Sequence, residues 1–454
     1  MRLIKPVYLL IVLVVAGATK LNAQQNNTFT LNQAIEYALK NNAEVKNALL
    51  DIDIAKKKIW ETTAQGLPQI SASLDYSYIP SIPEMKFTTP YLINPASSTG
   101  QNADQIKIGY QEIPIALGVK SSATIKANVS QLVFNGSYIV GLQTANIFKK
   151  LSEQGLSNTQ NNIRENVANS YYLVLMAENN LQVLNDVQKN MESTLAEMKA
   201  ILKEGFIEDT DVDQFQYTLT SIENTRKNIE RQAEIAQRLL KFQMGIDLST
   251  PIQLTDNFEN VMQSLNVESL LTAEFDVKQN ISYQLMQTQE KMMKMNVNLQ
   301  KSTFLPSVVA FYMHQEKTQK ADFDFTFPDM IGLSVNVPIF SSGMRVSKVS
   351  QAQMQLEKTQ NTSIIAAEGL KLQFEQAKSQ LLSSYEKYLN EKSNKELAEK
   401  IYNKTLIKYK EGLSGSMDLT QANSQLLNAL SNYYTSLYEM LSAKNKIENL
   451  MNKQ

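Results

Sequence analysis

Two long stretches of the chain place apolar residues at helical spacing. Apolar side chains recur every three or four residues through 167–202, and more loosely through 370–388. This spacing predicts a narrow apolar stripe on a continuous helix, suited to coiled-coil packing. Neither 137–203 nor 344–410 contains a proline, so nothing in them breaks a helix. Each interval is therefore predicted to form one helix, about 100 Å long.

Other segments alternate apolar and polar residues. In 70–78, 123–129 and 331–339 every second residue is apolar, and those between are small or polar. A period of two predicts β-strands. The segment 308–313 is a fourth candidate, although it is apolar at consecutive positions. Strands of about nine to twelve residues match a tilted membrane strand, and an apolar outer face with a polar inner face is typical of a water-filled barrel.

Four strands are too few to close a barrel. In a membrane, an open sheet edge leaves backbone groups unpaired, at a cost of several kcal/mol for each group. Three chains that pool their strands would give twelve. The alternative is a soluble β-sandwich, which would leave the two long helices unexplained.

Part of the sequence repeats at a constant offset of 207 positions. The pairs are Gly136 and Gly343, Gly205 and Gly412, and Asp211 and Asp418. A period this long indicates duplication of a strand-then-helix half, because short repeat units recur every 20 to 50 residues. The predicted fold class is mainly α with a membrane β-barrel portion.

These patterns divide the chain into eight parts. They are a signal peptide over 1–23; N-terminal helices over 24–66; a first membrane hairpin with a long extracellular loop over 67–135; a long helix, tip turn and return helix over 136–244; a linker over 245–275; a helix of the second half over 276–304; a second membrane hairpin over 305–342; and a second long helix, tip turn and return helix over 343–454. The insert at 79–118, rich in Pro, Ser, Asn and Gly, predicts a loop.

The first residues predict export. Arg2 and Lys5 precede an apolar run over 7–18, and Leu21-Asn22-Ala23 is an acceptable cleavage site. A retained membrane anchor is the alternative, but the run is shorter than the ~20 residues of a spanning helix. We therefore expect any membrane insertion to be by strands.

Composition narrows the chemistry. The chain has no cysteine, so it carries neither disulfides nor a lipid on a terminal cysteine, and 44 basic residues nearly balance 45 acidic ones. Without a basic field we expect no nucleic-acid partner. Nucleophile, phosphate-loop and zinc motifs are absent from the sequence, so we expect no enzyme activity and no cofactor. Met292, Met293, Met295 and His314 leave a metal-export role open, although such methionines are typically core filler.

Several motifs together resemble the outer-membrane factor (TolC) family, over nearly the whole exported chain. The strand-to-helix signature of the family is similar to Pro338-Ile339-Phe340-Ser341-Ser342-Gly343. The first half of the chain carries a less complete copy of it, Phe134-Asn135-Gly136. The turns resemble the Gly-x5-Asp-Val pattern of the family, with Leu419 in the second copy where Val212 stands in the first. Ala38-Leu39-Lys40-Asn41-Asn42-Ala43 is close to a helix-start pattern in which proline usually replaces Ala43.

The resemblance implies a homotrimer in the outer membrane of a Gram-negative bacterium. Its twelve-stranded barrel, with four strands from each chain, would contact outer-membrane lipid, and a trimeric α-helical barrel would extend into the periplasm. The helix tips would meet a periplasmic membrane-fusion adaptor, and an inner-membrane pump would drive substrate through the passive duct. The alternative is a secreted or periplasmic coiled-coil scaffold without a pore. A duct wall of Gln, Asn and Ser would discriminate little between substrates, so it is compatible with export of drugs, metals, polysaccharides or proteins.

The resemblance also suggests site residues at the tips. The adaptor contact would involve Gly205, Phe206, Asp211, Gly412, Leu413 and Asp418. Tyr409 and Asp211 match positions that hold a closing hydrogen bond in the family, and helix packing is the alternative role for Tyr409. Two positions depart from the family: Ser414 replaces an arginine, and Gln421 replaces the acidic residue of the narrowest ring. We expect Tyr409→Phe to raise leak conductance.

Overall fold

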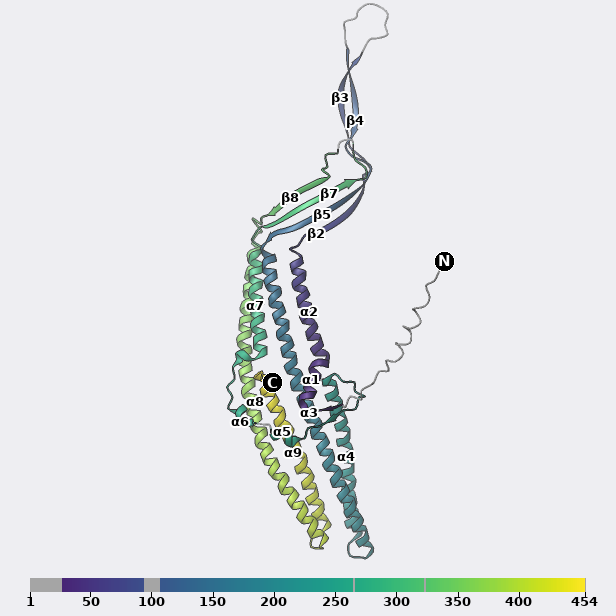
Figure 1. The fold of residues 1–454 in the computed structure, drawn as a ribbon, viewed down its shortest axis with the longest axis vertical. Coiled ribbons are helices and arrows are strands. Elements are labelled where there is room, and N and C mark those ends of the chain that lie inside the picture. The colour runs from purple at the N-terminus through teal and green to yellow at the C-terminus, as the bar shows by residue number, and fades with distance from the viewer. Residues whose placement is uncertain (1–26, 94–106, 264–265, 322–323, 454) are drawn as a thin grey trace, which may run out of the picture. The chain divides into compact units, whose positions relative to one another are not determined.

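The computed structural model describes residues 27–93, 107–263, 266–321 and 324–453 (Figure 1). The signal peptide predicted over 1–23 lies outside the described residues. The chain divides into two compact units, which are described separately. We call 1–49, 155–284 and 366–454 the helical unit, and 50–154 and 285–365 the sheet unit.

Two helical hairpins dominate the helical unit. The first joins α3 (Gly136–Lys203) to α4 (Asp209–Met244), and the second joins α8 (Met344–Lys410) to α9 (Ser416–Leu450) (Figure 1). α3 has 68 residues and α8 has 67, so the two long helices predicted from periodicity are confirmed. Residues 136–154 of α3 and 344–365 of α8 belong to the sheet unit.

The four helices share a core near the tips. Met191 and Met198 from α3, Phe215 from α4, Tyr402 from α8 and Leu419 from α9 are all buried in it. Each of these residues belongs to an apolar stripe with a helical spacing of three or four residues. Burial of these stripes therefore holds the two hairpins against each other within the helical unit.

A second core surrounds the middle of the hairpins. It includes residues of α1 (Leu31–Asn41), α5 (Phe258–Gln263) and α6 (Val267–Leu271). A parallel pair of two-residue strands, β1 (Thr28–Phe29) and β6 (Gln253–Leu254), joins the start of the described chain to the predicted linker. A short 3₁₀ helix, η2 (Val277–Gln279), follows.

Tyr171 ties these segments to α3. Its hydroxyl donates to the carbonyl of Phe29 (2.9 Å) and to the carboxylate of Asp256 (3.0 Å). Asp256 also accepts from the backbone N–H of Leu31 (2.8 Å). Burial raises the pKa of the Tyr171 phenol well above its usual range, and the Asp256 charge contributes. The phenol therefore stays protonated and remains a donor at neutral pH.

The sheet unit contains one antiparallel sheet of four strands in the order β2-β5-β7-β8. The strands are β2 (Gln69–Tyr78), β5 (Ser121–Asn135), β7 (Ser307–Lys317) and β8 (Asp329–Asn336). All four strand predictions are confirmed, although β5, at 15 residues, is longer than expected and β8, at 8, is shorter. The described sheet is a single layer, so the sandwich alternative is wrong.

Helices lead into and out of this sheet. α2 (Ala43–Ala64) precedes β2, and α7 (Ile281–Ser302) precedes β7. A Cβ added to Gly136, where α3 begins, would lie 2.6 Å from Leu305 and 3.2 Å from the carbonyl of Ser302. A glycine therefore lets the start of α3 approach the end of α7 closely.

The predicted loop at 79–118 is wrong for half of its residues. It contains an antiparallel ribbon of β3 (Glu84–Ile93) and β4 (Lys107–Ala116). Pro90 and Pro114 lie within these strands and favoured a loop in the sequence. In a ribbon of two strands, however, each strand has one unpaired edge, where a missing N–H costs no ladder bond.

Candidate functional site

The two tip turns have the same backbone structure. In the first, the N–H of Gly205 bonds to the carbonyl of Leu202 (3.0 Å), and that of Phe206 to the carbonyl of Ile201 (3.3 Å). In the second, Gly412 bonds to Tyr409 (3.0 Å) and Leu413 to Lys408 (2.8 Å). This pair of bonds is the Schellman motif, which ends a helix with a left-handed residue.

The glycines are required at these positions. Gly205 has a backbone φ of 75° and Gly412 a φ of 74°, and residues with a Cβ rarely adopt such positive angles. Each turn then exposes one large apolar residue: Phe206 is 81% exposed and Leu413 is 78% exposed. Exposed apolar side chains at the corresponding position of two adjacent hairpins are a suitable contact for a protein partner.

The first turns of the return helices carry the predicted aspartates. Asp211 is half-buried in α4, and Asp418 is exposed in α9. Asp418 accepts from the Ser414 hydroxyl (2.9 Å) and from the Gly415 N–H (3.3 Å), so it caps its own helix. Both carboxylates also interact favourably with the positive end of a helix dipole.

A hydrogen bond links the two tips, and Tyr409 does not make it. The buried hydroxyl of Ser416 in α9 donates to the carboxylate of Asp211 in α4. Among the described residues, the buried Tyr409 hydroxyl has no hydrogen-bond partner. In the described chain Asp211 therefore accepts this bond from Ser416 and not from Tyr409, and no sequence motif marks Ser416.

Tyr409 nevertheless lies in an acidic environment. Burial raises the pKa of its phenol above the usual range, and the carboxylates of Asp211 and Glu197 raise it further. Lys410 and Glu197 form an ion pair between α8 and α3 at 3.7 Å, but both side chains are about half exposed, at 51% and 48%. Such a pair contributes little to stability. Gln421 is exposed on α9.

The four-stranded sheet has one mainly apolar and one mainly polar face, and the apolar side carries His314 and Asp329 at one end. Directly opposed residues of an antiparallel pair lie on the same face. Ile70 pairs with Val129, Val129 with Tyr312, and Tyr312 with Ile331, so these four residues share one side. The same register places Leu74, Tyr76, Leu333 and Val335 with them; Tyr76 is 70% exposed and Ile331 84%.

The opposite face carries mainly serine, threonine, asparagine and one ion pair. Lys126 and Asp75 lie there, 2.9 Å apart. Phe311, Met313 and Met330 are apolar exceptions on this face, and the first two explain why 308–313 looked apolar on both sides. Gly332 stands opposite Phe311, and a Cβ there would lie 2.8 Å from the aromatic ring. Phe311 therefore covers a glycine rather than projecting freely from the polar face.

The residues considered for metal chemistry are separated. Met292, Met293 and Met295 are half-buried on α7, while His314 is on β7 and contacts Asp329 (2.8 Å). Within the described ranges, no three His, Cys, Asp or Glu side chains are grouped so that they could hold a metal ion.

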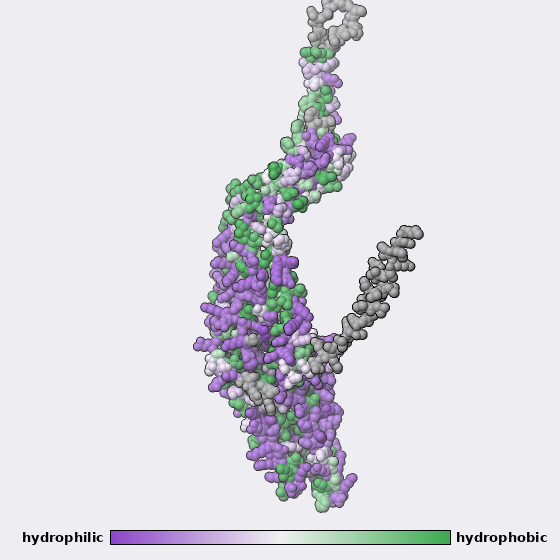
Figure 2. Space-filling view, in the orientation of Figure 1, coloured by the Kyte–Doolittle hydropathy of each residue, from purple (hydrophilic) through white to green (hydrophobic). Residues whose placement is uncertain are grey.

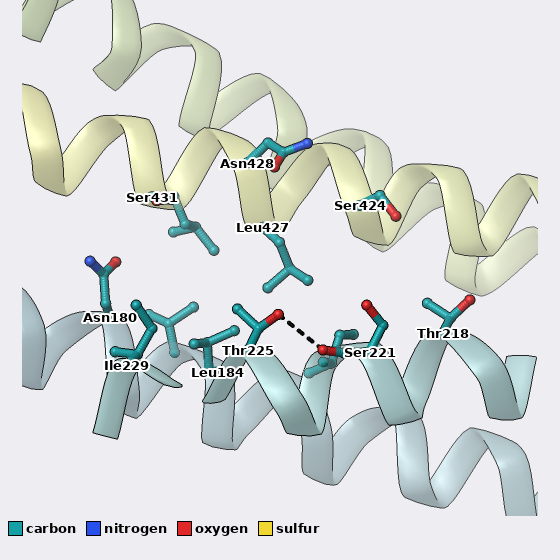
Figure 3. A pocket seen from close by; sticks show the side chains of 13 residues that line it. Asn180, Leu184, Thr218, Ser221, Thr225, Ile229, Ser424, Leu427, Asn428 and Ser431 are labelled. Atoms are coloured by element: carbon teal, nitrogen blue, oxygen red, sulfur yellow. Dashed lines mark hydrogen bonds between the residues drawn. The ribbon is translucent and has the colours of Figure 1, made fainter. Parts of the chain in front are cut away.

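A cavity of about 380 Å³ lies in the helical unit between α9 and the α3–α4 hairpin (Figure 3). Hydroxyl and amide side chains, including Ser221, Thr225 and Asn428, line it beside Leu184 and Leu427. The Thr225 hydroxyl donates to the backbone carbonyl of Ser221 (2.9 Å), so it is already satisfied. Because the described lining is uncharged, the cavity offers no group for acid–base chemistry.

Among the described helices, none is both long and apolar enough to cross a membrane. The helices of the helical unit present a mostly hydrophilic surface, whereas hydrophobic residues gather over the sheet (Figure 2).

Comparisons with known proteins agree with this geometry. The family model described as outer membrane efflux protein matches residues 279–453. The outer membrane protein TolC of Salmonella enteritidis is 23% identical over 380 residues, which cover 78% of this chain and 67% of that protein.

Solved structures match over a larger part of the chain. The CmeC outer membrane channel of Campylobacter jejuni matches with a TM-score of 0.71 at 16% identity, covering 93% of this chain and 85% of that one. The outer membrane protein VceC of Vibrio cholerae matches with a TM-score of 0.68 at 15% identity, covering 93% and 95%. At these identities the structures establish a shared fold. The family model, the TolC relative and the duplicated tip turns agree that the chain is similar to the outer-membrane factor (TolC) family.

Proposed function

We propose that the protein is a trimeric exit duct of the outer membrane, which passively conducts substrate from a periplasmic adaptor and an inner-membrane pump to the exterior. The observation that carries this proposal is the four-stranded sheet. Its apolar face suits lipid, its polar face suits a water-filled lumen, and its described edges, β2 and β8, have no partner strand.

Those open edges favour assembly. An unpaired strand edge in a membrane is costly because no water satisfies its backbone groups. Pairing β2 of one copy with β8 of the next removes every edge when the ring closes. Three copies would supply twelve strands, and rotational symmetry would use the same two edges in each copy.

The tips support the second half of the proposal. Phe206 and Leu413 project from turns of the same conformation, so a trimer would present six apolar positions in a ring. A periplasmic adaptor with an apolar, helical tip is the partner this surface fits. The bond between Ser416 and Asp211 would hold the two hairpins of a chain together in the closed duct.

The test is extraction of the full-length protein from outer membranes with detergent. We expect light scattering to give the mass of three chains, and the purified protein to form single channels in planar bilayers. A monomeric, water-soluble rod without conductance would refute the duct and favour the scaffold alternative.

The adaptor contact has its own test. A photo-crosslinking residue at Phe206 or Leu413 should capture one periplasmic protein in cells. The same residue at Tyr217, which is 78% exposed on the side of α4, is the matched control. Equal capture at Tyr217 and at the tips would contradict the proposed contact.

A further inference from the structure

The β3–β4 ribbon continues the β2–β5 hairpin past the other two strands. One ladder ends with the pair Tyr78 and Ser121, and the next begins with Glu84 and Ala116. Between them the N–H of Ile79 bonds to the carbonyl of Lys120 (2.8 Å), so the interruption is short. The ladder between β7 and β5 reaches only the pair Lys317 and Thr124. The ribbon is therefore a two-stranded extension of a four-stranded sheet.

The register of the ribbon separates charged from uncharged residues. Within 84–92 and 108–116, one face has no charged residue, and we call it the uncharged face. It consists of Met85, Phe87, Thr89, Tyr91, Gly109, Gln111, Ile113 and Ile115. The last pair of the ladder, Ile93 and Lys107, places one lysine on the same side at the far end of the ribbon. The opposite face carries Glu84, Lys86 and Glu112, and Lys86 pairs with Glu112 at 3.2 Å. Exposed apolar side chains also lie on it, at Leu92, Ile108 and Tyr110.

The uncharged face is apolar and open to solvent in the single chain. Met85, Phe87 and Tyr91 are 46%, 47% and 50% exposed. Tyr91 lies across Gly109, where an added Cβ would be 2.6 Å from the ring, and this contact fixes the shape of the surface. A ribbon of two strands is at best marginally stable in water, so a covered face would stabilise it considerably.

We propose that the uncharged face is covered by the same face of the ribbons from the other two copies, so that three ribbons form a collar at the exit of the duct. This inference rests on the proposed trimer. A threefold axis brings three identical residues together, and a charged residue near the axis would meet two like charges. Within 84–92 and 108–116, all charge lies on the opposite face, as such a contact requires. The ribbon also begins where β2 ends, and β2 is an edge that the trimer would pair.

Disulfide cross-linking tests the collar directly, because the chain has no cysteine of its own. Phe87→Cys and Ile113→Cys place a thiol at two directly opposed positions of the uncharged face. Thr88→Cys and Glu112→Cys, also directly opposed, are the matched controls on the other face. Each variant has a single thiol, so any disulfide joins two copies. Oxidation in intact outer membranes should give severalfold more dimer for the first pair than for the second.

The assembly is measured in parallel, to separate this inference from the proposed function. If the variants are conducting trimers and all four positions cross-link equally, or none does, the collar is wrong and the duct stands. The same holds if the thiol of the Phe87→Cys variant resists cross-linking but is shielded from a membrane-impermeant maleimide, because another molecule then covers the face. If the parent protein is not a trimer, both proposals fail.

Discussion

The Tyr171 hydroxyl connects three segments that are far apart in the sequence. It donates to Phe29 and Asp256, and Asp256 in turn holds the first N–H of α1 at Leu31. The tyrosine is fully buried, and loss of its hydroxyl would remove one hydrogen bond from each of two half-buried groups, the Phe29 carbonyl and the Asp256 carboxylate.

We expect Tyr171→Phe to reduce stability by about 1–3 kcal/mol, because a half-buried carboxylate and a carbonyl each lose a hydrogen bond. The measurement is the apparent Tm of the detergent-solubilised protein. Tyr217→Phe, at a side chain that is 78% exposed, should leave the Tm unchanged. Equal Tm values for the two variants would show that the Tyr171 network contributes nothing.

Ser416 and Tyr409 lead to different expectations at the tips. Ser416 joins α9 to α4 through Asp211, while the Tyr409 hydroxyl has no partner among the described residues. Removing the serine hydroxyl therefore breaks a contact between hairpins, whereas removing the tyrosine hydroxyl breaks none that the structure describes.

In planar bilayers, Ser416→Ala should raise leak conductance more than Tyr409→Phe does. A hydrogen bond to a charged group contributes about 1.5–3 kcal/mol, so the open fraction should rise by about tenfold or more. Ser414→Ala is the control, because the Ser414 hydroxyl bonds to Asp418 within its own turn. A larger leak from Ser414→Ala would argue against the role of Ser416.

Among the elements, the regular ones were predictable from the sequence. Periodicity without proline identified α3 and α8, and alternation identified β2, β5 and β8, because burial of one face imposes its period on the residues. The ribbon was missed because Pro90 and Pro114 are tolerated at its free edges. The strands β1 and β6 have two residues each, which is too short for any period to appear.

The contact between Ser416 and Asp211 had no local signal. Each residue lies in the first turn of a helix, where serine and aspartate are common for capping reasons alone. Only the packing of α4 against α9 brings the two side chains together. The duplicated glycines, in contrast, were a local signal, because each turn demands a left-handed residue.

Replacing Gly412 in the second tip turn should therefore lower the stability of the α8–α9 hairpin. Gly412 has a φ of 74° and no atoms near an added Cβ, so Gly412→Ala incurs only the backbone penalty of about 1–2 kcal/mol. Gly369 lies inside α8 with equally open space, and Gly369→Ala should stabilise by about 0.5–1 kcal/mol. Thermal denaturation of both variants checks the opposite signs, and the same sign for both would contradict this account.

At the scale of the whole molecule, the proposed duct would expose the apolar face of the sheet to lipid and the polar face to the water-filled lumen. Leu333 and Ser334 are neighbours on β8 that lie on opposite faces. The helix tips lie in the other unit, so a change on β8 tests membrane insertion separately from adaptor contact.

Leu333→Arg should impair insertion, because arginine on a lipid-facing strand costs about 2–4 kcal/mol near the membrane centre. Ser334→Arg should leave insertion intact and shift ion selectivity toward anions, because its charge would face the lumen. Outer-membrane fractionation and reversal potentials in bilayers measure the two effects. Equal insertion of both variants would mean that the face assignment is wrong.

The parallel pairing of β1 with β6 also restricts when the protein can finish folding. Leu31 and Asp256, which adjoin this pair, are 225 residues apart in the chain. A polypeptide that crosses the inner membrane with its N-terminus first must hold Thr28 and Phe29 unpaired until Gln253 and Leu254 have followed. Closing so long a loop is slow, so on the proposed route to the outer membrane, chaperones would meet the early half with β1 still unpaired.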